Sequence, residues 1–276
     1  MFNSKRINVV ITPVNDLEAI EIKKLCELHH QLVLVTGQQW GASWSGLEPQ
    51  IQSIIANSPK GVYFYGVELQ GTAPYTNCYN IDHHRYGDDD RWNPKSSLEQ
   101  VAELLGVEIG IREKMVVAND RGHIDAMKRL GEKLGLNETL KSELISEIRL
   151  ADRSAQGITP EQEAVAEEAI AHREVIGDLT IVKMAHSKCA TVTDRLYGQY
   201  KSLLVYTPGE EINFYGDWAS VEEISLAIPG GWSGNGFWGI SDGSPEMYNR
   251  VRTLITGPDW TKRVGRRKGM IAMAFK

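Results

Sequence analysis

Cysteine is scarce in this chain. Three cysteines, Cys26, Cys78 and Cys189, occur in 276 residues, and they are odd in number and far apart. This pattern excludes a disulfide framework and a structural zinc site built from clustered cysteines. Long apolar runs are missing as well, since no stretch approaches about 18 consecutive apolar residues and no signal-peptide pattern follows the first residues. We therefore expect a cytoplasmic protein that has no membrane partner.

An excess of positive charge is also missing. The formal net charge is −6, whereas a protein that grips long duplex nucleic acid draws on many Lys and Arg contacts to phosphates. A small phosphorylated substrate or a short oligonucleotide fits this balance better. One basic run, residues 262–268, contains five cations in seven residues. Such a run is typical either of a solvated tail or of a clamp for substrate phosphates.

The sequence does contain a carboxylate and two imidazoles in a row. Asp82-His83-His84 follows the apolar-rich run 77–81, which places the tripeptide at the carboxyl end of an expected strand. Imidazole nitrogens and carboxylate oxygens suit divalent ions, and such ions can activate water near neutral pH. His29-His30 has no such carboxylate before it and lies inside an expected helix. We interpret that second pair as structural.

Further acidic residues follow the other apolar segments. Asp16 and Glu18 come at a turn after the first β-rich run, Glu68 ends a later strand-like run, and Asp120 stands at another turn. Helical segments separate the expected strands, and crossovers of this length indicate a parallel sheet. Because ligands collect outside the carboxyl ends of parallel strands, we expect these acids and the histidines to converge.

Together these motifs resemble those of the DHH phosphoesterase superfamily, which includes RecJ-type exonucleases, nano-RNases, cyclic-dinucleotide phosphodiesterases and the manganese pyrophosphatases. The tripeptide Asp82-His83-His84, for which that family is named, is intact. The segment 12–20 is similar to the family's first motif, with Asp16 and Glu18 on its two acids and Thr12 in place of its histidine.

Two further motifs of the family have counterparts. Its second motif is a strand that ends in Asp, which Glu68 replaces, and its fourth resembles Asp-x-Gly, which Asp120-Arg121-Gly122 matches. Glutamate ligates the same metals as aspartate but reaches one methylene further. The replacements at Glu18 and Glu68 are therefore expected to alter the spacing or the occupancy of a metal pair.

The resemblance implies a hydrolase centre with one or two Mn²⁺ or Mg²⁺ ions. The implied metal ligands are Asp16, Glu18, Glu68, His83 and Asp120. By the same resemblance, His84 would contact the scissile phosphate or donate a proton. Asp82 would either ligate the metal or orient a neighbouring imidazole. A donor set dominated by oxygen favours manganese or magnesium over zinc.

The order of the expected elements indicates two α/β domains. A parallel-sheet, DHH-type catalytic domain is expected over residues 1–157 and a smaller α/β substrate-binding domain over residues 176–276. A linker helix is expected over residues 158–175, because Thr159 is a plausible cap and Pro160 suits the first helical position.

The second half contains a glycine-rich segment, residues 229–239, which carries Trp232 and Trp238. Glycines let a backbone approach a ligand and tryptophans stack on bases, but a glycine-rich turn with its tryptophan in the core is an equal alternative. Gly230-Gly231 resembles the start of the family's Gly-Gly-x-His loop, whose histidine is absent. Substrate contacts are expected from Arg85, Gly230, Gly231, Trp232, Arg266 and Arg267.

The leading hypothesis is a metal-dependent phosphoesterase that acts on a small nucleotide or a short oligonucleotide. A pyrophosphatase-like hydrolase is an alternative, because residues 265–268 are similar to the basic motif near the end of the manganese pyrophosphatases. A non-catalytic nucleotide-binding protein is another, in which Thr12, Glu18 and Glu68 mark an eroded metal centre. The sequence leaves open the substrate, the number of metal ions and a homodimer.

Overall fold

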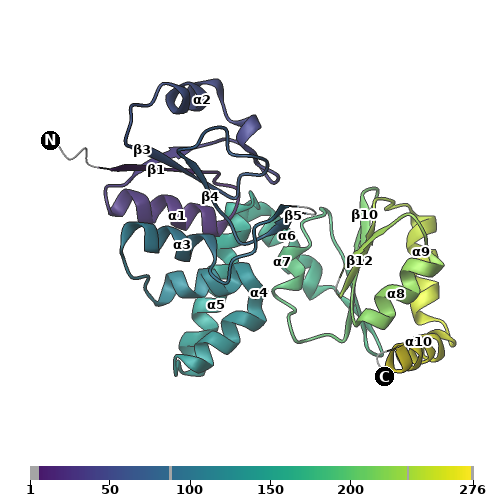
Figure 1. Ribbon diagram of the computed structural model, residues 1–276. Helices are drawn as coiled ribbons and strands as arrows, with labels where there is room; N and C mark the ends of the chain where they lie inside the picture. Colours follow the sequence, from purple (N-terminus) through teal and green to yellow (C-terminus); the bar gives the residue numbers. More distant parts are fainter. Residues whose placement is uncertain (1–5, 87–88, 235, 275–276) are drawn as a thin grey trace. The chain divides into compact units, whose positions relative to one another are not determined.

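The chain divides into two compact units, Met1–Gly157 and Ile158–Lys276. The computed structural model describes residues 6–86, 89–234 and 236–274, with side chains for all of these except 85, 86, 89, 90 and 269–274. Each unit contains its own sheet covered by helices (Figure 1). The expected α/β fold class is therefore confirmed. Within the described residues, no helix has the length and apolar content needed to cross a membrane.

The first unit is built on a four-stranded sheet with the strand order β2-β1-β3-β4, in which all pairs are parallel. Its strands are β1 (Ile7–Thr12), β2 (Leu32–Val35), β3 (Val62–Val67) and β4 (Cys78–Ile81), beside the small hairpin of β5 (Arg85–Tyr86) and β6 (Asp89–Asp90). Its helices are α1 (Leu17–Leu28), η1 (Trp44–Gly46), α2 (Pro49–Ala56), α3 (Ser97–Leu105), α4 (Ile111–Lys133) and α5 (Glu138–Ala155).

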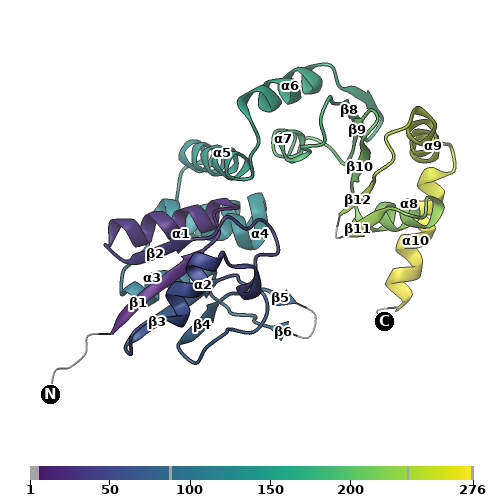
Figure 2. The ribbon, with the colours of Figure 1, turned by 90° about the horizontal axis from the view of Figure 1, so that it is seen from above.

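Helices cover both faces of this sheet. On one face lie η1 and α2, and Trp44 of η1, Ile51 of α2 and Leu47 between them form a core cluster with Val9 and Phe64 of the strands. The other face is covered by α1 and α3, as Figure 1 shows, and α1 runs alongside β1 and β2 in Figure 2. Because the carboxyl half of β1 is buried on both faces, Val9, Val10 and Ile11 form a continuous apolar run instead of an alternating one.

The strand order creates a switch point between β1 and β3. The chain leaves β1 toward β2 on one side and returns to β3 on the other side. At the carboxyl ends of two such adjacent strands the connections diverge, and a space that accepts ligands is left between them. Asp16 follows β1 at this point, and Glu68 follows β3.

Local capping fixes where the two neighbouring helices begin. Asp16 is the N-cap of α1, and its Oδ1 atom accepts a hydrogen bond of 2.8 Å from the backbone N–H of Ala19. Ser96 and Glu99 form a reciprocal capping box at the start of α3. The caps at Asp16 and Ser96 thus fix the residues at which α1 and α3 begin.

The second unit contains a six-stranded mixed sheet with the order β11-β12-β10-β9-β8-β7. Its strands are β7 (Glu174–Ile176), β8 (Leu179–Lys183), β9 (Ser202–Thr207), β10 (Glu211–Tyr215), β11 (Trp232–Gly234) and β12 (Phe237–Ile240). Its helices are α6 (Pro160–Ala171), α7 (Ala190–Thr193), α8 (Trp218–Ala227), α9 (Pro245–Thr256) and α10 (Trp260–Ala274). The helix expected as a linker, α6, packs on α7 and β8 and falls within this unit.

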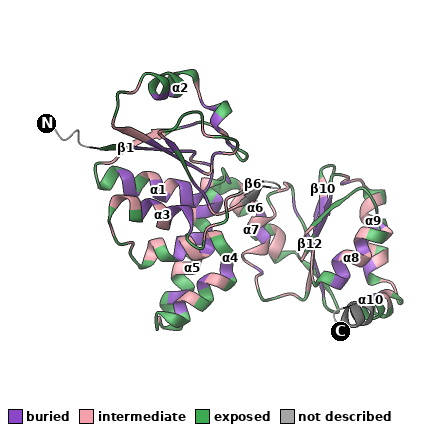
Figure 3. Ribbon diagram, in the orientation of Figure 1, coloured by how far each residue is buried: buried purple, intermediate pink, exposed green. Residues whose placement is uncertain are grey.

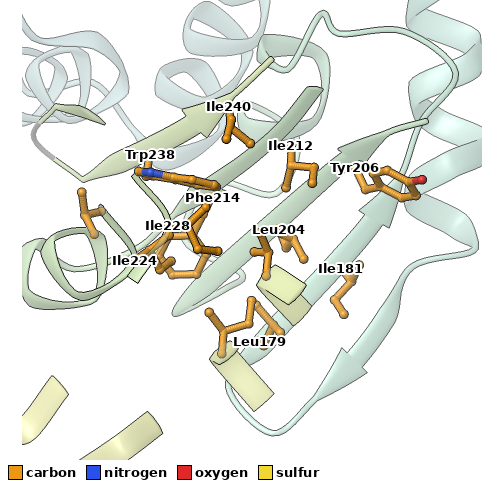
Figure 4. Close-up of a cluster of buried hydrophobic side chains, with 13 residues drawn as sticks. Leu179, Ile181, Leu204, Tyr206, Ile212, Phe214, Ile224, Ile228, Trp238 and Ile240 are labelled. Carbon is orange, nitrogen blue, oxygen red and sulfur yellow. The ribbon is translucent and has the colours of Figure 1, made fainter. Parts of the chain in front are cut away.

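Two hydrophobic clusters hold the second unit together. The larger packs Phe214 and Trp238 of the sheet against Ile224 of α8 and Val251 of α9 (Figure 4). The smaller packs Val182 and Leu203 against Ala166 of α6 and Val192 of α7. Figure 3 shows that buried positions follow the strands and the inward sides of the helices, while the outer sides of the helices are exposed.

Candidate metal centre

Four side chains from four separate segments of the first unit converge on one point. Glu18 comes from the first turn of α1, Glu68 follows β3, His83 follows β4, and Asp120 lies on α4. The first three stand at the carboxyl edge of the parallel sheet, as the strand pattern predicts. Asp120 was expected at a turn, but it lies in a helix, two residues before a break in that helix at Gly122.

His83 is the residue that these carboxylates share. Its Nε2 atom lies 3.0 Å from Oδ2 of Asp120, 3.4 Å from Oε1 of Glu68 and 3.7 Å from Oε2 of Glu18. Two overlapping groups of donor atoms result, Glu18-His83-Asp120 and Glu68-His83-His84, with the atoms of each group within 4.8 Å of one another. Asp16 belongs to neither group, and its Oδ1 atom caps α1.

Several of these donor atoms are buried without a hydrogen-bond partner. In the described part of the chain, Oε2 of Glu18, Nε2 of His83 and Oδ2 of Asp120 are buried atoms that make no hydrogen bond. Oε2 of Glu18 and Oδ2 of Asp120 lie close to Nε2 of His83, but neither contact has the geometry of a hydrogen bond. Native proteins rarely leave buried polar atoms unsatisfied, and an ion is one of the usual reasons when they do. The donor set, one imidazole with carboxylates, fits a divalent cation.

Asp82 is oriented toward the backbone and toward His84. Its Oδ1 atom accepts hydrogen bonds from the backbone N–H groups of His83, at 2.8 Å, and His84, at 3.0 Å. The same oxygen lies 3.0 Å from Nδ1 of His84. The side chain of Arg91 lies nearby, with Nη1 3.7 Å from Oδ2 of Asp82. Oδ1 of Asp82 therefore orients His84, while Oδ2 of Asp82 is buried and makes no hydrogen bond to a described residue.

The start of α3 positions two of the acids, a contribution that the sequence analysis missed. The backbone N–H of Leu98 donates a 3.0 Å hydrogen bond to Oε1 of Glu18. The hydroxyl of Ser97 donates a 2.8 Å hydrogen bond to Oε1 of Glu68. The signal was present in the capping-box pattern of Ser96 and Glu99, which predicts a helix N-terminus that attracts carboxylates.

The electrostatics of the centre reflect an excess of buried carboxylates. Burial by itself would lower the pKa of His83, but contacts with the carboxylates around it outweigh burial and raise that pKa to about 12. Burial raises the pKa of Glu68 and of Asp120, and the contact of each with His83 opposes the rise. Burial also raises the pKa of Asp16, to about 7, against the hydrogen bond from Ala19. One imidazolium therefore does not balance this site, and a divalent cation would.

Two residues at the centre have strained backbones. Glu68 has a φ of 54° and His123 has a φ of 55° with a ψ of −149°. Residues other than glycine rarely adopt positive φ, and the conformation of His123 is close to a region that glycine alone visits readily. At His123 the strain accompanies the break in α4, and Glu68 is the first residue after β3. Such strain clusters at functional sites.

Thr12, which stands where the family that the sequence resembles has a histidine, adds no donor to the cluster. It is fully buried, and its hydroxyl donates a 2.9 Å hydrogen bond to the carbonyl of Pro13. The first strand therefore ends in a satisfied hydroxyl at this position. In this part of the chain, the candidate metal donors are therefore the carboxylates that follow β1, Asp16 and Glu18.

The substrate-binding residues expected in the second unit have local roles. Arg267 pairs with the α8 acids, with Nε 3.5 Å from Oε2 of Glu222 and Nη2 3.4 Å from Oε2 of Glu223. Arg266 is exposed on α10. The basic run 262–268 lies within this helix and is therefore not an extended tail. The side chain of Arg85 lies outside the described residues.

The glycine-rich segment serves the packing of β11 on β12. A Cβ atom at Gly231 would lie 2.4 Å from the carbonyl oxygen of Gly239, while Gly230 has a φ of +95° in the turn before β11. Trp238 is 1% exposed and lies in the core, which is the second of the two alternatives given for the tryptophans of this segment. Trp232 is 41% exposed and packs against Gly239.

Comparison with solved structures places the fold. The chain is similar to the pGpG-specific phosphodiesterase PggH from Vibrio cholerae, with a TM-score of 0.50, 14% sequence identity, and coverage of 96% of this chain and 99% of that one. It also matches a protein of Helicobacter pylori G27 with a TM-score of 0.33, 9% identity, and coverage of 91% and 98%. No protein-family model and no curated protein matches the chain. The first similarity supports a phosphoesterase-like fold.

Proposed function

We propose that this protein is a metal-dependent phosphoesterase of the DHH type that hydrolyses a phosphoester bond of a small nucleotide or short oligonucleotide. The observation that carries the proposal is the convergence of Glu18, Glu68, His83 and Asp120, whose buried donor atoms include three without hydrogen-bond partners in the described part of the chain. The similar fold of a phosphodiesterase supports the same reaction class. A net charge of −6 supports a small substrate.

Glu18, Glu68, His83 and Asp120 would hold the metal, and Asp16 would contribute through the carboxylate oxygen that does not cap α1. Mn²⁺ or Mg²⁺ is the proposed ion, since oxygen donors dominate. When bound, the ion supplies Lewis-acid stabilisation of the phosphoryl group and activation of water. The carboxylates of α1 and α4 hold the negative charge that attracts the ion into a buried position.

His84 would contact the substrate and donate a proton to it, and Asp82 would position His84. The contact with Asp82 raises the pKa of the His84 imidazole, although burial opposes the rise. A raised pKa favours the protonated ring, which can donate to a phosphoryl oxygen or to the leaving oxygen. Asp82 acts as a positioning residue, because the same Oδ1 atom binds the His84 backbone and approaches its ring.

Hydrolysis of a small substrate panel tests the proposal. The panel contains a linear dinucleotide, a cyclic dinucleotide, a nucleoside monophosphate and pyrophosphate, each with Mn²⁺ or with chelator. We expect Mn²⁺-dependent turnover of a nucleotide substrate by the wild type, its loss in His83→Ala, and its retention in the control His29→Ala, whose side chain is exposed at the end of α1. Turnover of pyrophosphate alone would select the pyrophosphatase-like alternative. Absence of turnover and of bound metal would favour a non-catalytic nucleotide-binding protein.

A further inference from the structure

Trp40 is the most exposed tryptophan in the part of the chain that the structure describes. Its side chain is 67% exposed, compared with 3% for Trp44 in the adjacent η1. Exposure of an indole forfeits the free energy that burial of a large aromatic side chain provides. An exposed tryptophan next to a candidate active site therefore indicates a side chain that a ligand covers.

The indole borders two hollows, and each is lined by residues of the metal centre. The first has a volume of about 200 Å³ and is lined by Trp40 together with Glu18, Asp120 and His123. The second has a volume of about 130 Å³ and is lined by Trp40 together with Glu68 and His84. Trp40 thus lines both hollows. A ligand group that contacts the indole would lie next to the metal donors that line the same hollows.

The loop that carries Trp40 is fixed at both ends. Before the tryptophan, Oε1 of Glu48 accepts hydrogen bonds from the backbone N–H of Gly37, at 2.7 Å, and from the hydroxyl of Thr36, at 3.1 Å. After it, the backbone N–H of Gln70 donates a 2.8 Å hydrogen bond to the carbonyl of Ala42. The indole is therefore presented by an anchored loop, which reduces the entropy lost when a ligand binds.

A second set of bonds closes the loop on itself. The side chain of Gln38 accepts a hydrogen bond of 3.0 Å from the backbone N–H of Ser43 and donates one of 3.1 Å to the carbonyl of the same residue. Gly41, next to the tryptophan, has a φ of +85°. This left-handed position allows the chain to turn directly after Trp40 at little steric cost.

We propose that Trp40 is the specificity-determining residue that stacks on a nucleobase of the substrate. The inference rests on the proposed function, since it places the base beside the phosphoester bound at the metal centre. The π-face of an indole accepts any base, so the residue selects nucleotides over phosphoesters without a base. Trp40 belongs to the same unit as the metal donors and shares both hollows with them, whereas Trp232 and the core residue Trp238 belong to the other unit.

The test compares Trp40→Ala and Trp40→Tyr with the wild type on a dinucleotide and on its abasic analogue. Trp218→Ala is the matched control, because Trp218 is also exposed, at 47%, but lies on α8. We expect Trp40→Ala to raise KM for the dinucleotide by about 10- to 100-fold, the range of one lost stacking contact. We expect Trp40→Tyr and Trp218→Ala to stay near the wild type, and the abasic analogue to be turned over equally by all four proteins.

Equilibrium binding separates this inference from the proposed function. Calorimetric titration of the dinucleotide into each protein measures stacking without turnover, and thermal melts by circular dichroism verify that the variants are folded. If the wild type binds but does not hydrolyse the dinucleotide while Trp40→Ala loses affinity, the stacking role stands and the phosphoesterase proposal fails. Unchanged affinity in Trp40→Ala, an equal loss on the abasic analogue, or no binding by the wild type would overturn the inference.

Discussion

Nε2 of His83 lies 3.0 Å from Oδ2 of Asp120, and each of these two buried atoms makes no hydrogen bond to another described residue. The two residues come from different kinds of element, since His83 follows a strand and Asp120 lies in the interior of α4. A donor and an acceptor this close would align if the contact were purely structural. Their lack of alignment indicates that both atoms face a shared partner.

Removal of His83 is expected to abolish tight metal binding. His83→Ala takes away the atom common to both groups of donors. We expect its affinity for Mn²⁺ to fall by more than about 100-fold, the upper end of the effect of losing an outer-shell partner. Calorimetric titration measures the affinity, and His29→Ala, an exposed histidine of the same unit, should bind like the wild type. Equal affinity in wild type and His83→Ala would remove His83 from the ligand set.

Metal binding is also expected to release protons. The surrounding carboxylates raise the pKa of His83 to about 12, so its ring is protonated in the metal-free protein at neutral pH. A ligating imidazole must be neutral, so about one proton or more leaves for each ion bound near pH 7.5. Titrations in buffers of different ionisation enthalpy measure this number. A binding enthalpy that is independent of the buffer would contradict the assignment of His83 as a ligand.

Asp82 is expected to act through the two histidines that it orients. Asp82→Asn keeps an oxygen that can accept from the backbone N–H groups of His83 and His84, but it removes the charge that faces the His84 ring. We expect a loss of about 10- to 100-fold in metal affinity or turnover. Asp178→Asn, an exposed acid paired with Lys201, is the matched control. A variant as active as this control would show that the orientation by Asp82 is dispensable.

The metal-free protein is expected to lose stability as the pH rises through about 7, because of Asp16. Burial raises the pKa of this carboxyl to about 7. Its folded-state pKa thus exceeds the unfolded value, so its contribution to stability is complete below about pH 4 and is lost as the pH rises through about 7. Asp16→Asn keeps a capping side chain and removes this titration.

Chemical unfolding in chelator at about pH 5 and about pH 8 measures the difference. Across this interval, the free energy of unfolding should fall by about 2 to 4 kcal/mol more in the wild type than in Asp16→Asn. The comparison of the two proteins cancels the other titrating groups, including the similarly shifted Glu68 and Asp120. Parallel pH profiles would show that Asp16 keeps an ordinary pKa in the folded state.

The sheet and the edge that carries the donors could be predicted because their signal is local. An apolar, β-branched run followed directly by an acid or a histidine marks both the strand and its carboxyl end, as at Glu68 and His83. Parallel pairing then requires these ends to meet. The α/β fold class follows from the same alternation of strands and helices.

The remaining features depend on contacts between residues far apart in the sequence. The capping box at Ser96 predicts the start of α3, but it does not show that the Leu98 backbone binds Glu18. The position of Asp120 within α4 has no local signal either. The exposed Trp40 and the buried Trp238 have the same chemistry in the sequence, and only packing separates them. Glycines next to a tryptophan are equally consistent with a binding loop and with tight strand packing, which is the arrangement at Gly231.

Gly66 is expected to couple the stability of the first unit to the position of Glu68. It lies in β3, and a Cβ atom there would come within 2.4 Å of the Trp44 ring and 2.8 Å of Leu69. Trp44 is 3% exposed, and its Nε1 atom donates a 2.6 Å hydrogen bond to Oδ1 of Asn80 that a shift of the ring would break. Gly66→Ala should therefore lower the free energy of unfolding by about 1 to 3 kcal/mol, the usual effect of overpacking.

The matched control for Gly66→Ala is Gly265→Ala. Gly265 lies inside α10 with no atom within 4 Å of an added Cβ, so alanine there should raise stability by about 0.5 to 1 kcal/mol through its higher helix propensity. Urea unfolding measures both changes. Because Glu68 lies two residues beyond Gly66, Gly66→Ala should also weaken Mn²⁺ binding, whereas Gly265→Ala should not. Destabilisation without any loss of metal affinity would show that the end of β3 absorbs the strain before it reaches Glu68.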